Sequence, residues 1–349
     1  MEMTRLSRQS NYELLRIIAM AMILVGHFIV HGLQHGQAFL DQTMIQNPMG
    51  QYMQVIIFSF LPIGVNLFIL ISGFFRIRLR WTSLIHFCLL CIFYNLIDFL
   101  IFTINNDVFS IKEFVKVFLI SKTGNWFFRA YFWLLLISPL LNKAIEGMNE
   151  KTYDFMVGCL VFLNCVSGYL LQSQNVNGFN VLHFIFIYCV GAWIQWRKAY
   201  LDQFPKYRYL LAYIICSLMI AGPALCILIL TTSSINIIFY YHNPLIVLSS
   251  VAVFLFISKY SFTSRFVNSF ASTVVAALFL QEVIFEPGLY QYMKSIYGIY
   301  GDGLILYGII VGLSIALLLL AFVIEYPRKH LTTALINRIL PHLPPLPTE

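Results

Sequence analysis

Charged residues are scarce in this sequence: Asp, Glu, Lys and Arg make up 11% of its 349 residues, whereas 60% are hydrophobic. A soluble globular chain carries about 25% charged residues. The length would permit two soluble domains, but no stretch of ordinary polar composition is long enough to form one. The scarcity of charge therefore excludes a water-soluble globular fold, and lipid is the expected solvent.

Several familiar motifs are also missing. The sequence has no GxxxxGK[ST] phosphate loop, no HExxH zinc motif, no GxSxG nucleophile elbow and no internal repeat of the kind that many transporters carry. Its seven cysteines all lie in apolar segments, and the single CxxC at Cys88 and Cys91 has no second pair. We interpret them as small apolar helix residues rather than as a metal or redox site.

What the sequence does have is a series of long apolar runs. A membrane-spanning helix needs about 20 mostly apolar residues. We therefore predict an all-α polytopic integral membrane protein of about ten transmembrane helices, with a single membrane domain at 1–340 and a Pro-rich tail at 341–349. The helices are expected near 12–31, 52–75, 82–104, 125–141, 155–171, 180–196, 209–230, 241–258, 269–286 and 303–326, with an interfacial or re-entrant helix at 111–120.

The basic residues predict the orientation. With the N-terminus inside, sixteen of the 22 Lys and Arg residues fall in inside segments, four in outside segments and two within spans. This asymmetry places both termini in the cytoplasm. The net charge of +7 does not indicate nucleic-acid binding, because the basic residues form short clusters between apolar runs rather than one patch.

Ionisable residues inside a span are costly and need a partner or a role. In the first helix, His27 follows Arg16 by eleven residues, which puts these two within about 20° of one face, and Glu13 lies one turn before Arg16 and can pair with it. We expect this stripe to face one polar cavity that begins at the cytoplasmic mouth and passes the membrane centre. A charge pair that braces the bundle, with a hydrogen-bonded histidine, is the structural alternative.

The stripe suits acyl transfer. Arg16 is a permanent cation for a phosphate or carbonyl oxygen. His27 can act as a general base toward a hydroxyl, which we favour, or can carry the acyl group briefly. His31 and His35 continue the face of His27, but we expect them to lie beyond the helix with no acidic ligand near in sequence. No metal site is therefore predicted.

Two segments resemble the acyltransferase 3 family of membrane proteins. Residues 11–19 (Asn-Tyr-Glu-Leu-Leu-Arg-Ile-Ile-Ala), followed by His27, resemble the family's opening, in which an arginine is followed after ten residues by a histidine. Residues 64–75 resemble the family's G-V-(D/N)-x-F-x-x-x-S-G-(F/Y) segment, and a basic run at 76–80 follows it. Weaker matches lie at 125–128, 139–142, 188–191 and 243–245.

The resemblance implies a ten-helix acyltransferase of the bacterial cytoplasmic membrane. It implies transfer of an acyl group, in the first instance acetyl, from cytoplasmic acyl-CoA to a hydroxyl of a surface glycan or a lipid-linked saccharide. Acyl-CoA would be a substrate, with no cofactor bound permanently, and membrane lipid the remaining partner; assembly into a homo-oligomer is left open. A glycan exporter without acyl chemistry is the alternative, and it would explain buried charges equally well.

The resemblance also suggests roles for single residues. Arg76, Arg78 and Arg80 would meet the phosphates of acyl-CoA, with an ordinary cytoplasmic basic cluster as the alternative. Asn66 would hydrogen-bond the stripe, and Ser72 would line the substrate channel or serve in helix packing. We assign Trp126 to the interfacial aromatic belt, with a platform for a sugar ring as the alternative. The sequence departs from the family at 280–282, where Leu-Gln-Glu replaces a Leu-Ile-His-Glu-like end, so any role of that histidine is absent.

Overall fold

A computed structural model describes residues 9–33, 48–119, 126–173, 177–231, 235–286, 288–344 and 346. These residues form helices and connecting turns without a strand, which confirms the all-α prediction. The longer elements are α1 (Ser10–His27), α2 (Pro48–Phe58), α3 (Gly64–Phe74), α4 (Trp81–Asn106), α6 (Trp126–Glu146), α7 (Glu150–Val161), α8 (Val181–Trp196), α10 (Lys206–Leu230), α11 (Pro244–Ser258), α14 (Gly288–Tyr300) and α15 (Leu304–Ile339).

Short helices complete the fold. They are η1 (Phe28–Leu33), α5 (Ile111–Val117), η4 (Phe162–Leu170), α9 (Lys198–Leu201), η5 (Asn236–Phe239), α12 (Arg265–Ala271), α13 (Val275–Phe279), η6 (Leu280–Ile284) and η7 (Leu340–His342). Of these, η1, η4 and η6 are π-helical turns that continue α1, α7 and α13.

Among the residues that the structure describes, seven continuous helical segments are long and apolar enough to cross a membrane, so the chain is a membrane protein. They are Ser10–Leu33, Trp81–Asn106, Glu150–Leu170, Lys206–Leu230, Asn236–Ser258, Arg265–Ile284 and Leu304–His342, with α3 and α8 as shorter apolar helices. Each of the ten predicted segments contains helix. The count of ten spans and the cytoplasmic side of both termini stay predictions.

The predicted helix at 52–75 is wrong as a single element. It is broken into α2 and α3 by a series of turns over 59–63. Pro62 explains the break, because its ring disfavours helical backbone at the preceding residue. The helix predicted at 303–326 is too short, since α15 continues through Pro327 to Ile339. Within α15, Glu325 pairs with Arg328 at 2.6 Å. The short helix expected at 111–120 is present as α5.

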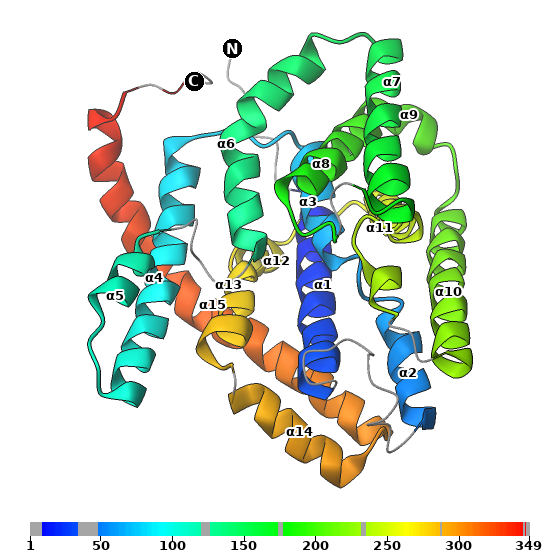
Figure 1. The fold of residues 1–349 in the computed structure, drawn as a ribbon. Helices are drawn as coiled ribbons and strands as arrows, with labels where there is room; N and C mark the ends of the chain where they lie inside the picture. The colour runs from blue at the N-terminus through cyan, green and yellow to red at the C-terminus, as the bar shows by residue number, and fades with distance from the viewer. Residues whose placement is uncertain are drawn as a thin grey trace.

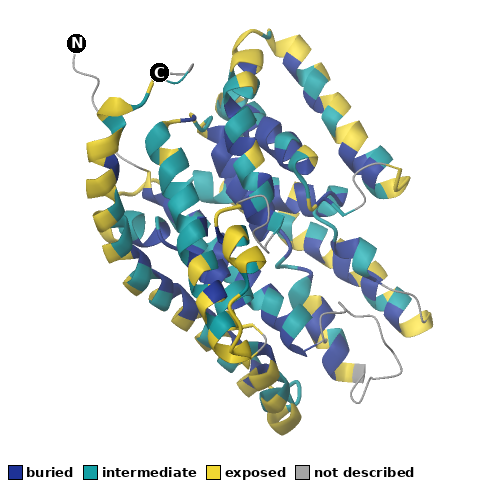
Figure 2. Cartoon of the chain, turned by 60° about the vertical axis from the view of Figure 1, so that its left-hand side comes forward, coloured by how far each residue is buried: buried dark blue, intermediate teal, exposed yellow. Residues whose placement is uncertain are grey.

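Helix α3 forms the centre of the bundle, and every one of its residues is buried. It packs against α1 on one side and α8 on another (Figure 1). Small residues allow the close approach of α3 and α8: a Cβ on Gly73 would lie 2.0 Å from the carbonyl oxygen of Tyr188, and one on Gly191 would lie 2.4 Å from that of Leu70. Buried residues line the interior of the molecule, and exposed ones follow its outward faces (Figure 2).

Candidate active site at the two ends of helix α1

Helix α1 carries the three predicted stripe residues on one uninterrupted helix. Arg16 Nη1 lies 3.1 Å from a carboxylate oxygen of Glu13, as the spacing predicts. His27 ends the helix, about 16 Å along the axis from Arg16. The stripe therefore has a charge pair near its beginning and a histidine at its end.

His27 is paired with an acidic residue distant in sequence. Its Nδ1 lies 3.0 Å from Oε1 of Glu282, with side chains 22% and 18% exposed. Tyr290 donates its hydroxyl hydrogen to the same oxygen of Glu282. Burial and the Glu282 carboxylate raise the pKa of Tyr290, so this hydroxyl stays protonated and keeps its role as donor. His27 thus lies beside a carboxylate that accepts a hydrogen bond from a tyrosine.

Local backbone structure brings this pair together. Glu282 lies in η6, and a π-helical turn changes the direction of side chains relative to an α-helix and is frequent at functional sites. Gln281, at the position where the family resemblance predicts histidine, donates from Nε2 to the carbonyl oxygen of Leu24, 3.0 Å away. That hydrogen bond ties η6 to α1 one turn before His27.

His31 lies on η1, so the expectation that it falls beyond the helix is wrong. Its ring centroid is 5.4 Å from that of His27, and ligand atoms of His27, His31 and Glu282 all lie within 4.8 Å of one another. The acidic ligand that is missing near the histidines in sequence is supplied by Glu282. His35 lies outside the described residues.

A cavity of about 490 Å³ opens beside His27, and we call it the His27 cavity. One side is formed by the His27, His31 and Glu282 side chains. Another is aromatic and includes Trp126, Phe179, Phe239, Tyr240 and Tyr241, with the amides of Asn177 and Asn236 among them. It is therefore apolar with a few polar groups, which is typical of a small-molecule site.

Trp126 lines this cavity. Its ring lies 4.9 Å from that of Phe179 and 5.7 Å from that of Tyr241, measured between centroids. These two contacts turn its indole toward the interior of the protein. Its assignment to the interfacial aromatic belt stays a prediction.

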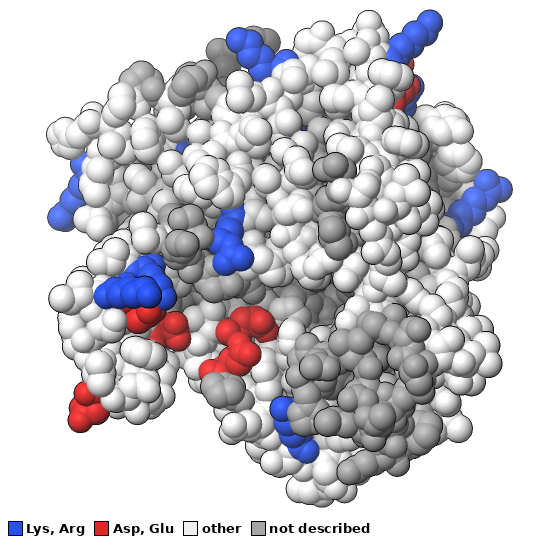
Figure 3. Space-filling view, viewed as in Figure 1, with Lys and Arg blue, Asp and Glu red and all other residues white. Residues whose placement is uncertain are grey.

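Glu282 also lines a second cavity of about 520 Å³, the acidic cavity, together with Glu286 of the same segment. The far wall carries Asp98 of α4, and Glu113 and Lys116 of α5, which pair with each other at 2.7 Å. Figure 3 shows acidic side chains gathered around a hollow on this face, with basic ones beside them. Glu282 thus lies between two cavities.

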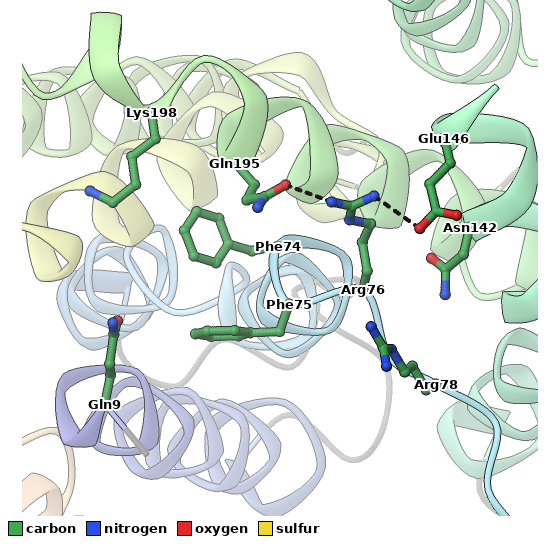
Figure 4. Close-up of a pocket in the computed structure, with 9 residues that line it drawn as sticks. All are labelled: Gln9, Phe74, Phe75, Arg76, Arg78, Asn142, Glu146, Gln195 and Lys198. Atoms are coloured by element: carbon green, nitrogen blue, oxygen red, sulfur yellow. Dashed lines mark hydrogen bonds and ion pairs between the residues drawn. The ribbon is translucent and has the colours of Figure 1, made fainter. Parts of the chain in front are cut away.

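A third cavity, of about 390 Å³, lies at the other end of α1, next to Gln9; we call it the Arg76 cavity (Figure 4). It is lined by the ends of α3, α6 and α8, with Arg76, Arg78 and Lys198 as its cations. Arg76 reaches between Glu146 and Gln195, with a distance of 3.4 Å to each. These contacts are long, which leaves the guanidinium able to exchange partners.

The backbone at Arg76 is unusual. Its φ is +48°, in the left-handed region that favours glycine after a helix. An arginine at this position is held at a conformational cost, and such residues concentrate at functional sites. Arg80 differs, because it is exposed at the start of α4 and does not line the cavity.

Asn66 does not contact the stripe. Its Oδ1 accepts a hydrogen bond from His183 Nε2 at 2.8 Å, and its Nδ2 donates to the carbonyl oxygen of Tyr241 at 3.1 Å. The expected hydrogen bond to the stripe is therefore wrong, and Asn66 instead supports the chain beneath the aromatic wall. Ser72 is buried, donates to the carbonyl oxygen of Phe68 and precedes Gly73 at the α3–α8 contact, which agrees with the packing alternative.

The structure describes one cavity at each end of the stripe. The His27 and Arg76 cavities are lined by different residues, and neither lining includes Glu13 or Arg16. The sequence interpretation also missed Glu282 as the partner of His27, and Lys198 and Gln195 in the Arg76 cavity. A sequence signal for the pairing of His27 with Glu282 was available, because an intramembrane histidine and an intramembrane acid both require partners.

The two ends of α1 offer different chemistry. A histidine held by a carboxylate and exposed to a cavity can accept a proton from a hydroxyl and return it to a leaving group. Guanidinium and ammonium groups around a polar cavity can bind phosphate. The arrangement thus combines a candidate proton-transfer site with a candidate anion site on one helix.

Comparison with protein-family models gives a match to the acyltransferase 3 model, described as an acyltransferase domain, over residues 9–326. The matched region begins at Gln9, ends within α15 and contains every residue named above as lining the three cavities. No curated protein and no solved structure matches the chain.

Proposed function

Because this chain belongs to the acyltransferase 3 family, we propose that it moves an acyl group, acetyl in the first instance, from cytoplasmic acyl-CoA to a hydroxyl of a surface carbohydrate. The proposal places the protein in the cytoplasmic membrane of a bacterium. The observation that carries it is the His27–Glu282 pair, 3.0 Å apart, in the wall of a cavity.

In the proposed reaction, His27 accepts the proton of the acceptor hydroxyl while the oxygen attacks the thioester carbonyl carbon. A C–O bond forms, the C–S bond breaks, and the proton returns from His27 to the departing sulfur, which leaves as free CoA thiol. Glu282 orients the imidazole and stabilises its charged form, and Tyr290 holds Glu282. The products are an ester and CoA, so no further reactant is required.

The donor is proposed to bind at the Arg76 cavity. The phosphates of acyl-CoA carry charge that Arg76, Arg78 and Lys198 can neutralise. Its long pantetheine arm would then carry the thioester along α1 toward His27, past the Glu13–Arg16 pair. Arg16 is 30% exposed and can contact the thioester carbonyl oxygen on this route.

The acceptor is proposed to bind in the His27 cavity. Sugar rings stack their C–H faces on aromatic side chains, and Trp126, Phe179 and Tyr241 form such a wall on the same cavity as His27. Asn177 lines this cavity too, and its buried Oδ1 accepts no hydrogen bond from the described residues, which leaves it available to a sugar hydroxyl.

The test is transfer of label from acetyl-CoA in membranes that contain the protein, with membranes that lack it as the control. Label is counted in surface glycan and in lipid-linked saccharide after free CoA compounds are removed. Transfer above the control supports the proposal. No transfer with several acyl-CoAs and the native glycans would contradict it and would favour the exporter without acyl chemistry.

Trp126→Ala is expected to raise the KM for the acceptor about tenfold and to leave the KM for acyl-CoA unchanged, because it removes one stacking surface. Trp133→Ala is the matched control, since Trp133 lies on the same helix but is half exposed and does not line the cavity. Initial rates at varied acceptor and donor concentrations measure both constants. An equal effect of the two substitutions would remove the aromatic wall from acceptor binding.

Arg76→Gly is expected to weaken donor binding without lowering the stability of the protein. Glycine relieves the left-handed backbone, so the melting temperature should stay equal or rise, while loss of the guanidinium raises the KM for acyl-CoA by about tenfold or more. Arg80→Gly should change neither quantity, since Arg80 has an extended backbone and is exposed. A normal donor KM in Arg76→Gly would place the phosphates elsewhere.

A further inference from the structure

The histidine and carboxylate groups beside the His27 cavity also have the composition of a metal site. Two imidazoles and one carboxylate, from His27, His31 and Glu282, form the donor set of many zinc enzymes, in which a water completes the tetrahedron. The three residues come from α1, η1 and η6, so they converge through the fold rather than through a sequence motif.

The ligand atoms of the three residues would need to move closer together to bind a zinc ion. The ligand atoms lie within 4.8 Å of one another, whereas tetrahedral zinc with bonds of about 2.0–2.1 Å holds its ligands about 3.4 Å apart. Rotation of the three side chains, which are all partly exposed toward the cavities, can close this difference. The fourth position would face the His27 cavity and remain open to water.

The surroundings favour a cation. Glu282 is shared with the acidic cavity, where Glu286, Asp98 and Glu113 add carboxylates and Lys116 is the sole cation in the lining that the structure describes. Lys116 is already paired with Glu113. A cavity with this excess of negative charge raises the local concentration of divalent cations next to Glu282.

We propose that His27, His31 and Glu282 bind a zinc-class divalent ion that inhibits the protein reversibly. The ion would take the carboxylate of Glu282 and a nitrogen of His27 and so break the 3.0 Å pair between them. With that pair broken, His27 can no longer exchange a proton with the acceptor. The binding stands on the ligand geometry alone, whereas the inhibition rests on the proposed acyl transfer.

Binding is tested on purified protein in detergent, prepared with an affinity tag free of histidine. Calorimetry with Zn²⁺ measures the affinity, and the visible spectrum of bound Co²⁺ reports tetrahedral geometry. One ion per chain is expected, with affinity reduced about 100-fold or more in His31→Ala. His330→Ala, which removes an exposed histidine of α15, should bind as the wild type does. Unchanged affinity in His31→Ala, or no binding by the wild type, overturns the site.

Inhibition is tested in the acetyl-transfer assay. Zn²⁺ is expected to abolish transfer by the wild type, and a chelator to restore it. With each rate taken relative to the same protein without metal, the Zn²⁺ concentration that halves transfer should be at least about 100-fold higher in His31→Ala than in the wild type, because the variant lacks one metal ligand. If Zn²⁺ inhibits this variant as strongly as the wild type, inhibition occurs elsewhere. Should acyl transfer itself be absent, calorimetry and the Co²⁺ spectrum still decide whether the metal binds.

Discussion

Acyl transfer is expected to fall by at least about 100-fold in His27→Ala, because general acid–base catalysis contributes about 10²–10⁴ to a rate. The loss should lie in kcat, since alanine removes the proton acceptor without altering the Arg76 cavity at the other end of α1. Initial rates with labelled acetyl-CoA at saturating donor measure it. Transfer that survives in His27→Ala would remove this histidine from the mechanism while leaving the family assignment intact.

Glu282→Gln tests the pairing itself. The amide keeps the shape of the side chain but loses the charge that orients and stabilises the imidazole, so we expect a loss of kcat of about tenfold or more, smaller than that of His27→Ala. Glu286→Gln is the matched control, because Glu286 lies four residues on and lines the acidic cavity without pairing with His27. Equal rates in the two glutamine variants would show that the charge of Glu282 is not used.

Hydropathy missed α14 but predicted ten segments that all contain helices, because the backbone of a membrane span must satisfy its own hydrogen bonds. It was insufficient to predict where they break. Pro62 separates α2 from α3, whereas Pro327 lies inside α15. Both prolines lack a backbone N–H, so the presence of proline alone does not predict where a helix ends.

The candidate site was predicted in part for a related reason. Helical periodicity relates residues on one helix, so it correctly paired Glu13 with Arg16 and marked His27 as the polar end of the stripe. It gives no information across helices, and Glu282 is 255 positions from His27. The π-helical turn of η6 adds a further obstacle, since it places Glu282 off the face that α-helical spacing predicts.

The basic run at 76–80 shows that sequence spacing does not predict the direction of side chains at a turn. Alternation of three arginines gave no reason to prefer one, because the direction of each depends on backbone angles after α3 ends. The left-handed φ of Arg76 turns it toward Gln195 and Glu146, and Arg80 instead precedes α4 on the surface. Only the folded backbone distinguishes these positions.

Gly73→Ala is expected to destabilise the protein by about 3 kcal/mol, at the upper end of overpacking effects. The added Cβ would lie 2.0 Å from the carbonyl oxygen of Tyr188, and a backbone atom of α8 cannot move aside as a flexible side chain can. Thermal unfolding in detergent, followed by the loss of monodisperse protein, measures the effect. The matched control is Gly312→Ala in α15, where the new methyl group meets no atom within 4 Å.

Gly73→Ala should also alter both the Arg76 cavity and the His27 cavity. Helix α3 ends beside Arg76, and its Asn66 supports the backbone of Tyr241 in the aromatic wall, so forcing α3 away from α8 displaces donor and acceptor sites together. Gly73→Ala protein that remains folded at low temperature is therefore expected to show raised KM values for both substrates, unlike Trp126→Ala or Arg76→Gly, which each affect one. A Gly73→Ala variant with normal stability and kinetics would contradict the close contact of α3 with α8, and with it the role of α3 in joining the two ends of the site.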